Sequence, residues 1–162
     1  MQTLTTTDGT TIAYQATGAG PALVLVVGAF CDRSTTEGLA ALLADSFTVY
    51  EYDRRGRGDS GDTAPYDVQR EVEDLAAVVA ATGETPYVYG HSSGAVIALE
   101  AAASGVPMRA LVAYEPPYTA EDDVALLAVR LHPQDRPRPP EAGPQRVPPG
   151  IEPATPVVVP RG

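Results

Sequence analysis

Residues 87–95 read YVYGHSSGA, a short β-type run followed by a serine that stands between two glycines. Gly90, Ser92 and Gly94 fit the pattern G-x-S-x-G, in which the serine occupies a strained turn between a strand and a helix. The turn needs glycines because larger side chains would collide with neighbouring backbone. The pattern predicts a nucleophile elbow formed by Gly90, His91 and Gly94, with the Ser92 hydroxyl as candidate nucleophile.

The flanking residues agree with this interpretation. Pro86 marks the start of a strand over residues 87–89, and the alanine-rich run 95–103 has helical composition. Gly105 is expected to end that helix, and a further strand is expected over residues 109–113. Strand, elbow and helix therefore follow one another in the order that the motif requires.

Two further segments indicate strands of the same sheet. Residues 22–27 form a continuous apolar run, which is typical of a strand buried on both faces of a parallel sheet. Residues 47–52 form a second strand that leads directly into DRRGRGDS at residues 53–60. Right-handed crossovers place the loops after these strands at the edge where ligands bind in open α/β sheets.

Together, the elbow, the apolar strand and the D-x-R-G-x-G-x-S block resemble the α/β-hydrolase family over about residues 1–118. The resemblance implies an α/β fold with a mostly parallel sheet, helices on both faces and an N-terminal hairpin. It also implies that the chain contains the first half of the fold, a truncated domain, because no later strands of the family are recognisable.

The rest of this segment predicts a hairpin and two helices. Asp8-Gly9 is a two-residue turn signal between strands near residues 3–7 and 10–16. A helix is expected over residues 35–44, and Asp67 can cap a second one over residues 68–81. The apolar positions expected to face the core are Leu39, Leu42 and Leu43 in the first helix, and Val72, Leu75, Ala76 and Val79 in the second.

Beyond residue 118 the composition changes. One short helix is expected within residues 119–132, on the spacing of Val124, Leu127 and Leu131. Ten of the thirty residues from Pro133 to Gly162 are proline, which predicts a disordered tail over 133–162. The expected organisation is a partial α/β-hydrolase domain over 1–118, the short helix and the tail.

The resemblance also implies a set of site residues. The oxyanion hole would take one backbone N–H from Ser93 and the other from Ala29 or Phe30. Candidate rim residues, which shape the site or contact substrate, are Asp53, Gly56, Gly58 and Glu115.

A complete triad is not evident. The family order is serine, then an acid, then a histidine. His91 adjoins the nucleophile, where its ring should point away from the hydroxyl. His132 follows Asp122 and Asp123 in the right order but lies only about ten residues beyond them, and is a weak candidate base. A serine without a base is a poor nucleophile, so little or no turnover is expected.

Composition excludes several function classes. The formal net charge of −10 disfavours nucleic acid and anionic membranes as partners. Cys31 is the single cysteine, so no internal disulfide is expected. With no leader-like N-terminus and no run long enough to span a membrane, the chain is expected to be cytoplasmic, without metal or cofactor.

Two functions remain open. The first is a serine hydrolase that acts through Ser92 on an ester, an amide or a related carbonyl of a small molecule. The second is a non-catalytic product: an inactive truncated or frame-slipped half-domain, or a binding module that keeps the pocket rim. A bare edge on the strand at 109–113 would favour self-association in that case.

Overall fold

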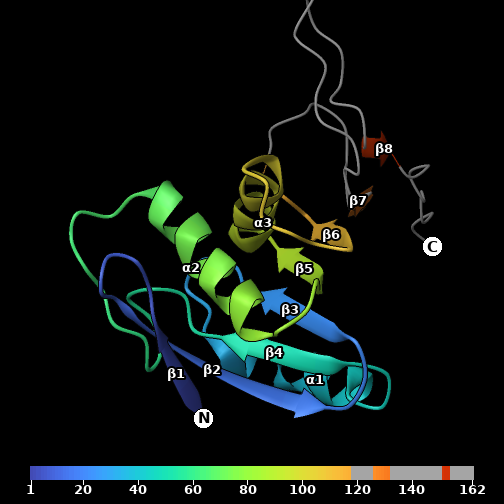
Figure 1. Ribbon diagram of the computed structural model, residues 1–162, viewed down its shortest axis with the longest axis horizontal. Coiled ribbons are helices and arrows are strands. Elements are labelled where there is room, and N and C mark those ends of the chain that lie inside the picture. The colour runs from blue at the N-terminus through green and yellow to red at the C-terminus, as the bar shows by residue number, and fades with distance from the viewer. Residues whose placement is uncertain (118–125, 132–150, 154–162) are drawn as a thin grey trace, which may run out of the picture.

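The structure, a computed structural model, describes residues 1–117, 126–131 and 151–153 (Figure 1). The candidate base His132, the N-terminal part of the expected short helix and most of the proline-rich tail lie outside these residues. The elements are, in chain order, β1 (Gln2–Thr5), β2 (Thr11–Gly18), β3 (Ala22–Val26), η1 (Arg33–Thr36), α1 (Glu37–Leu43), β4 (Thr48–Tyr52), α2 (Val68–Ala81), β5 (Tyr87–His91), α3 (Ser93–Ala103), β6 (Ala110–Tyr114), β7 (Leu126–Leu131) and β8 (Ile151–Pro153).

The sheet is parallel in its centre and antiparallel at both sides. Its strand order is β1-β2-β4-β3-β5-β6-β7-β8. Strand β3 pairs in parallel with β4 and β5, and β5 pairs in parallel with β6, whereas the other neighbours are antiparallel. The chain passes from β3 to β4 on one side and later returns to β5 on the other. The loops after β3 and β5 therefore diverge at a topological switch point, where open α/β sheets bind ligands.

Helices cover both faces of the sheet, as the sequence predicts (Figure 1). On one face α2 and α3 pack over the central strands, and this larger core includes Val72, Leu75, Val79, Ile97 and Leu111. On the other face α1 covers a smaller cluster around Leu25 and Val49. In α2 the predicted residues Val72, Leu75 and Val79 are buried and Ala76 is half-buried, while Val78, which the spacing did not single out, is wholly buried.

The predicted inner face of the first helix is wrong. Leu42 is 82% exposed and Leu39 is also exposed, whereas Ala40 is buried and Leu43 is partly buried. The helix is only two turns long and follows the turn η1, so Thr36, Ala40 and Leu43, at spacings of four and three, form the face that meets the sheet.

The N-terminal hairpin is present with a longer loop than predicted. The Thr6 N–H donates to the Thr10 carbonyl at 2.9 Å, which leaves three loop residues, 7–9, with Gly9 at φ 86°. One Asp8 carboxylate oxygen accepts from the Thr10 N–H and the Thr6 hydroxyl. The loop thus has three residues instead of two, because strand pairing on its N-terminal side ends at Thr6, one residue earlier than a two-residue turn would allow.

The segment predicted as a short helix contains a strand. Residues 126–131 form β7, which pairs antiparallel with β6, and residues 151–153 of the expected tail form β8. Strand β6 offers a row of unpaired N–H and C=O groups that a neighbouring apolar run can satisfy, and this outweighs the weak helical spacing of Leu127 and Leu131. The expected bare edge on the strand at 109–113 is therefore absent.

Candidate active site

Ser92 joins the end of β5 to the start of α3. Its backbone has φ 54° and ψ −125°, a combination that a residue with a side chain rarely adopts. The Ser92 N–H donates to the Tyr114 carbonyl at the end of β6, at 2.9 Å. The strained turn is thus held by the neighbouring strand, and it presents a half-buried serine at the carboxyl edge of the sheet.

Both glycines of the motif are required by close packing. A Cβ on Gly94 would lie 2.3 Å from the Val26 carbonyl oxygen and 2.4 Å from that of Val27. A Cβ on Gly90 would lie 2.6 Å from the Ala95 Cα. Gly94 therefore lets α3 pack directly on the backbone of β3, and Gly90 lets the helix turn back over its own strand.

The loop after β3 lies beside the serine. A Cβ on Gly28 would be 3.2 Å from the Ser92 Cβ and 3.3 Å from the His91 Nδ1. Ala29 and Phe30 follow and are exposed, and Phe30 has φ 61° with a wholly exposed ring. Ser93 is the first residue of α3, where backbone N–H groups have no partner within the helix.

His91 and Glu115 flank the turn. The His91 ring stacks on Tyr114, with ring centroids 5.7 Å apart and an interplanar angle of 28°. Within the described parts of the chain, His91 makes no hydrogen bond to the Ser92 hydroxyl. Glu115 is exposed just beyond β6, next to the residue that anchors Ser92, and has φ 48°.

Asp53, at the end of β4, is wholly buried and its carboxylate is used within the loop. It accepts the backbone N–H groups of Arg33 and Asp59, each at 2.9 Å, and forms an ion pair with the Arg33 guanidinium. Gly58, at φ 52°, passes so close that a Cβ would lie 2.2 Å from an Asp53 carboxylate oxygen. Gly56, at φ 71°, donates its N–H to the Gly61 carbonyl at 2.9 Å.

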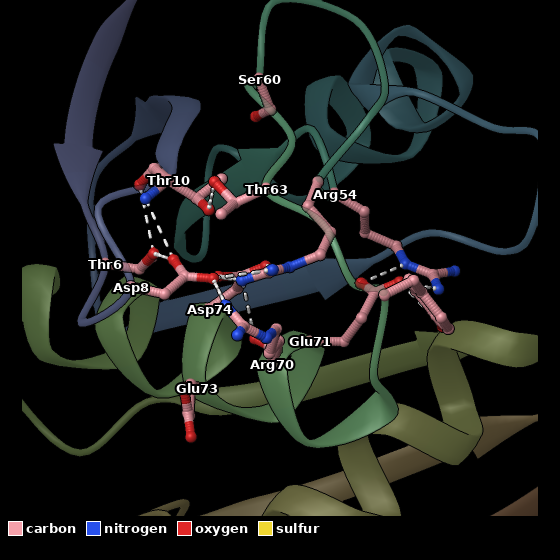
Figure 2. Close-up of polar contacts among 12 residues, drawn as sticks. Thr6, Asp8, Thr10, Arg54, Ser60, Thr63, Arg70, Glu71, Glu73 and Asp74 are labelled. Atoms are coloured by element: carbon pink, nitrogen blue, oxygen red, sulfur yellow. Dashed lines mark hydrogen bonds and ion pairs between the residues drawn. The ribbon is translucent and has the colours of Figure 1, made fainter.

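Sequence reasoning missed Arg54 and Glu71, which form a buried ion pair behind the elbow (Figure 2). The Arg54 Nε and Nη2 donate to the Glu71 carboxylate at 2.9 and 2.6 Å. The Arg54 Nη1 donates to the Ser93 Oγ at 2.9 Å and to the Val27 carbonyl at 3.2 Å. Burial alone would lower the pKa of Arg54, but Glu71 raises it. The guanidinium therefore remains charged.

A second buried pair joins Arg55 to Asp74, one turn further along α2. The Arg55 Nε and Nη2 donate to the Asp74 carboxylate, both at 2.7 Å, and the pKa of Arg55 is raised by these bonds. Asp8 of the hairpin accepts from Arg55 at 3.0 Å. Asp8 also pairs with Arg70 (Figure 2). The only sequence signal for either pair is the motif itself, in which two arginines follow Asp53.

A polar hollow lies elsewhere, between the hairpin loop and the start of α2. It is lined by Thr7, Asp8, Asp67, Gln69, Arg70 and Glu73, and shares no residue with the elbow. Among residues 1–117, 126–131 and 151–153, no three His, Cys, Asp or Glu side chains are grouped as metal ligands would be. No helix in the part of the chain that the structure describes is long and apolar enough to cross a membrane.

The fold and the elbow place this chain among known proteins. A sequence model described as "Alpha/beta hydrolase family" matches residues 23–161, so the chain belongs to the α/β-hydrolase family. This match continues past residue 118, where the recognisable motifs end.

The chain is similar to the N-formylmaleamate deformylase of Pseudomonas putida, with 39% identity over 104 residues, which are 62% of this chain and 39% of that protein. Among solved structures, an alpha/beta hydrolase from Sphaerobacter thermophilus is 55% identical with a TM-score of 0.73, covering 75% of this chain and 47% of that one. The esterase RhEst1 from Rhodococcus is 28% identical with a TM-score of 0.64, covering 68% and 43%. The chain thus spans less than half the length of these relatives.

Proposed function

We propose that this chain carries the nucleophile half of a serine hydrolase, which attacks an ester, an amide or a related carbonyl of a small molecule through Ser92. The observation that carries the proposal is the backbone of Ser92, which is strained, anchored to Tyr114 and packed between two glycines that accept no side chain. Such strain is costly and is typically kept where it serves function.

The neighbouring backbone supports the same chemistry. Ser93 opens α3, and the loop after β3 runs beside Ser92 at Gly28. N–H groups from Ser93 and from Ala29 or Phe30 would stabilise the negative charge that develops on a carbonyl oxygen under attack. Hydrolysis by this route needs no cofactor. The similar protein from Pseudomonas putida is named as a deformylase of N-formylmaleamate, a small molecule that carries a formyl group.

The residue that accepts the proton of the Ser92 hydroxyl is to be identified by mutation, because among the described residues no histidine is hydrogen-bonded to that hydroxyl. We expect His91 to serve as part of the elbow, since its ring stacks on Tyr114. His132 stays a candidate base, and Glu115 and Asp53 stay candidate rim residues, of which Asp53 is already bonded within its own loop.

Labelling with a fluorophosphonate tests the proposal. In that reaction the Ser92 Oγ bonds to phosphorus, the P–F bond breaks, fluoride leaves and the hydroxyl proton passes to a base. The single covalent step reports a nucleophile even where turnover is slow.

We expect one adduct, on the peptide containing Ser92, that Ser92→Ala removes. His91→Ala should change the rate only a few-fold, whereas His132→Ala should abolish labelling if His132 is the base. A folded protein that gains no adduct would contradict the proposal and favour the non-catalytic module.

A further inference from the structure

We propose that Arg54 is a positioning residue, which holds together the two backbone segments that carry the oxyanion-hole donors. The inference rests on the proposed function of Ser92 and adds a residue behind the site to it. Arg54 is not expected to touch substrate, because its side chain is 3% exposed and its guanidinium is already bonded on both sides.

One nitrogen of Arg54 bridges the two segments. The Nη1 donates to the Val27 carbonyl, directly before the Gly28–Phe30 loop, and to the Ser93 Oγ, directly after the nucleophile. The two segments directly follow different strands, β3 and β5, which pair in parallel at the switch point of the sheet. Because one nitrogen binds both segments, it fixes the distance between them. That distance matters because the N–H groups of an oxyanion hole, one from each segment, must point at the same oxygen atom.

The rest of the guanidinium is held so that Nη1 cannot rotate away. Nε and Nη2 form a two-point bond with the Glu71 carboxylate, whose side chain is fully buried. Paired geometry of this kind adds orientation as well as energy, and a lysine could not reproduce it. Tyr66 donates to the same carboxylate at 3.4 Å. The first turn of α2 is thereby coupled to the elbow through one planar group.

The protein contains its own control for this arrangement. Arg55 and Asp74 form a pair with the same two-point geometry and side chains 1% and 0% exposed, between the same loop and the same helix. Its remaining bonds go to Asp8 and to the Arg70 carbonyl, and none goes to the elbow or to the β3 loop. Loss of either pair should weaken the anchoring of α2, but only loss of the Arg54 pair should disturb the oxyanion hole.

The test compares the double variants Arg54→Met/Glu71→Gln and Arg55→Met/Asp74→Asn, each of which removes both charges of one pair. Saturation kinetics with a fluorophosphonate separate the maximal labelling rate from the half-saturating concentration. Small misplacements at an active site cost up to about 100-fold. We therefore expect the maximal rate to fall about 10- to 100-fold in the Arg54 variant and less than about threefold in the Arg55 variant, with unchanged half-saturation. Equal losses in the two variants would overturn the proposal.

A second readout is independent of chemistry at Ser92. Amide hydrogen exchange of residues 28–30 and 93–95 should accelerate in the Arg54 variant and stay near wild type in the Arg55 variant. If the wild-type chain is not labelled but this difference appears, the positioning role stands and the proposed hydrolase fails. If the wild-type chain is labelled but the two double variants change amide exchange and the maximal labelling rate to the same extent, the positioning role of Arg54 is wrong and the proposed function of Ser92 stands.

A milder variant covers the case in which the Arg54 double variant does not fold. Ser93→Ala removes one acceptor of Arg54, keeps the backbone N–H and leaves the buried pair intact. We expect Ser93→Ala to slow labelling about three- to tenfold. Arg54 would still bind the Val27 carbonyl, but it would no longer bind the segment that contains residue 93. A rate equal to that of wild type would overturn the proposal. When Ser93→Ala is added to Arg54→Met/Glu71→Gln, the labelling rate should fall little further, because the effects of substitutions at interacting residues do not add.

Discussion

Two glycine-rich loops follow parallel strands at the same edge of the sheet. Each contains one polar residue that is a candidate for the site, and the two residues lie in opposite environments. In the elbow, Gly90 and Gly94 allow the backbone to pack closely, and Ser92 between them has a strained backbone and a half-buried side chain. In the loop at 53–60, Gly58 closes around Asp53, which is fully buried and accepts two backbone N–H groups.

The difference shows that a motif does not reveal whether its polar residue acts or anchors. Both loops combine glycines at special positions with one polar residue that is a candidate for the site. Only the partners distinguish them: Asp53 has its oxygens occupied by Arg33 and Asp59, whereas the elbow uses its backbone bonds to hold Ser92 in an unfavourable conformation. Three substitutions in these two loops test this contrast, and a fourth tests the anchoring carboxylate of Asp8 in the hairpin loop.

Gly94→Ala should have the largest effect. Its Cβ would lie 2.3 Å from a backbone oxygen of β3, so either the helix or the strand must move. We expect unfolding free energy to fall by about 3 kcal/mol or more, with loss of Ser92 labelling. Gly38→Ala is the matched control, since nothing lies within 4 Å of that site in α1, and it should stabilise by up to about 1 kcal/mol. Urea denaturation measures both; similar values would contradict the close packing.

Asp53→Asn should destabilise by about 2 kcal/mol, because the buried amide replaces a charged acceptor of several bonds. Labelling of Ser92 in the folded variant should change less than about tenfold. The control is Asp62→Asn in the same loop, where the side chain is exposed and the expected change is below about 0.5 kcal/mol. A large loss of labelling with unchanged stability would instead make Asp53 a catalytic or rim residue.

Ser92→Gly should raise stability while it removes labelling. Glycine adopts positive φ without strain, so relief at φ 54° should contribute about 1 kcal/mol, visible as a higher Tm in calorimetry. Ser92→Ala removes the hydroxyl but keeps the Cβ, and should show no such gain. A lower Tm for the glycine variant would mean that the elbow stores no strain.

The smallest expected effect is on acid stability. Hydrogen bonds from Thr10 and Thr6, together with Arg55, hold the pKa of Asp8 well below its usual 3.8. A lowered pKa means that the ionised form stabilises the fold above about pH 4 and that this contribution fades as the pH falls toward 2. Asp8→Asn should be less stable than wild type at pH 7, and the difference should narrow at pH 3. Urea midpoints at both pH values measure it; a constant difference would contradict the assignment.

Much of the α/β architecture could be predicted because it depends on local pattern. The run at 22–27 is buried in β3, the cap at Asp67 begins α2 as expected, and the strand and helix around the elbow lie in their predicted order. Errors occurred where local pattern was weak. The two-turn helix α1 faces the sheet with Ala40, and residues 126–131 pair with β6 instead of forming a helix.

The amino-acid order by itself determined the elbow motif, because Gly90, Ser92 and Gly94 lie within five positions and match its pattern. The close contacts that exclude a Cβ at Gly94 come from the backbone of β3, and so depend on the tertiary structure. The amino-acid order also determined which segments are apolar enough to be buried. Only the tertiary structure decided the partners of Arg54, Arg55 and Asp53. The two acids that neutralise the arginines lie 17 and 19 residues away on α2. Such pairs exist because burial leaves no water to solvate a charge, and which charges are buried together is set by packing of the helix on the sheet.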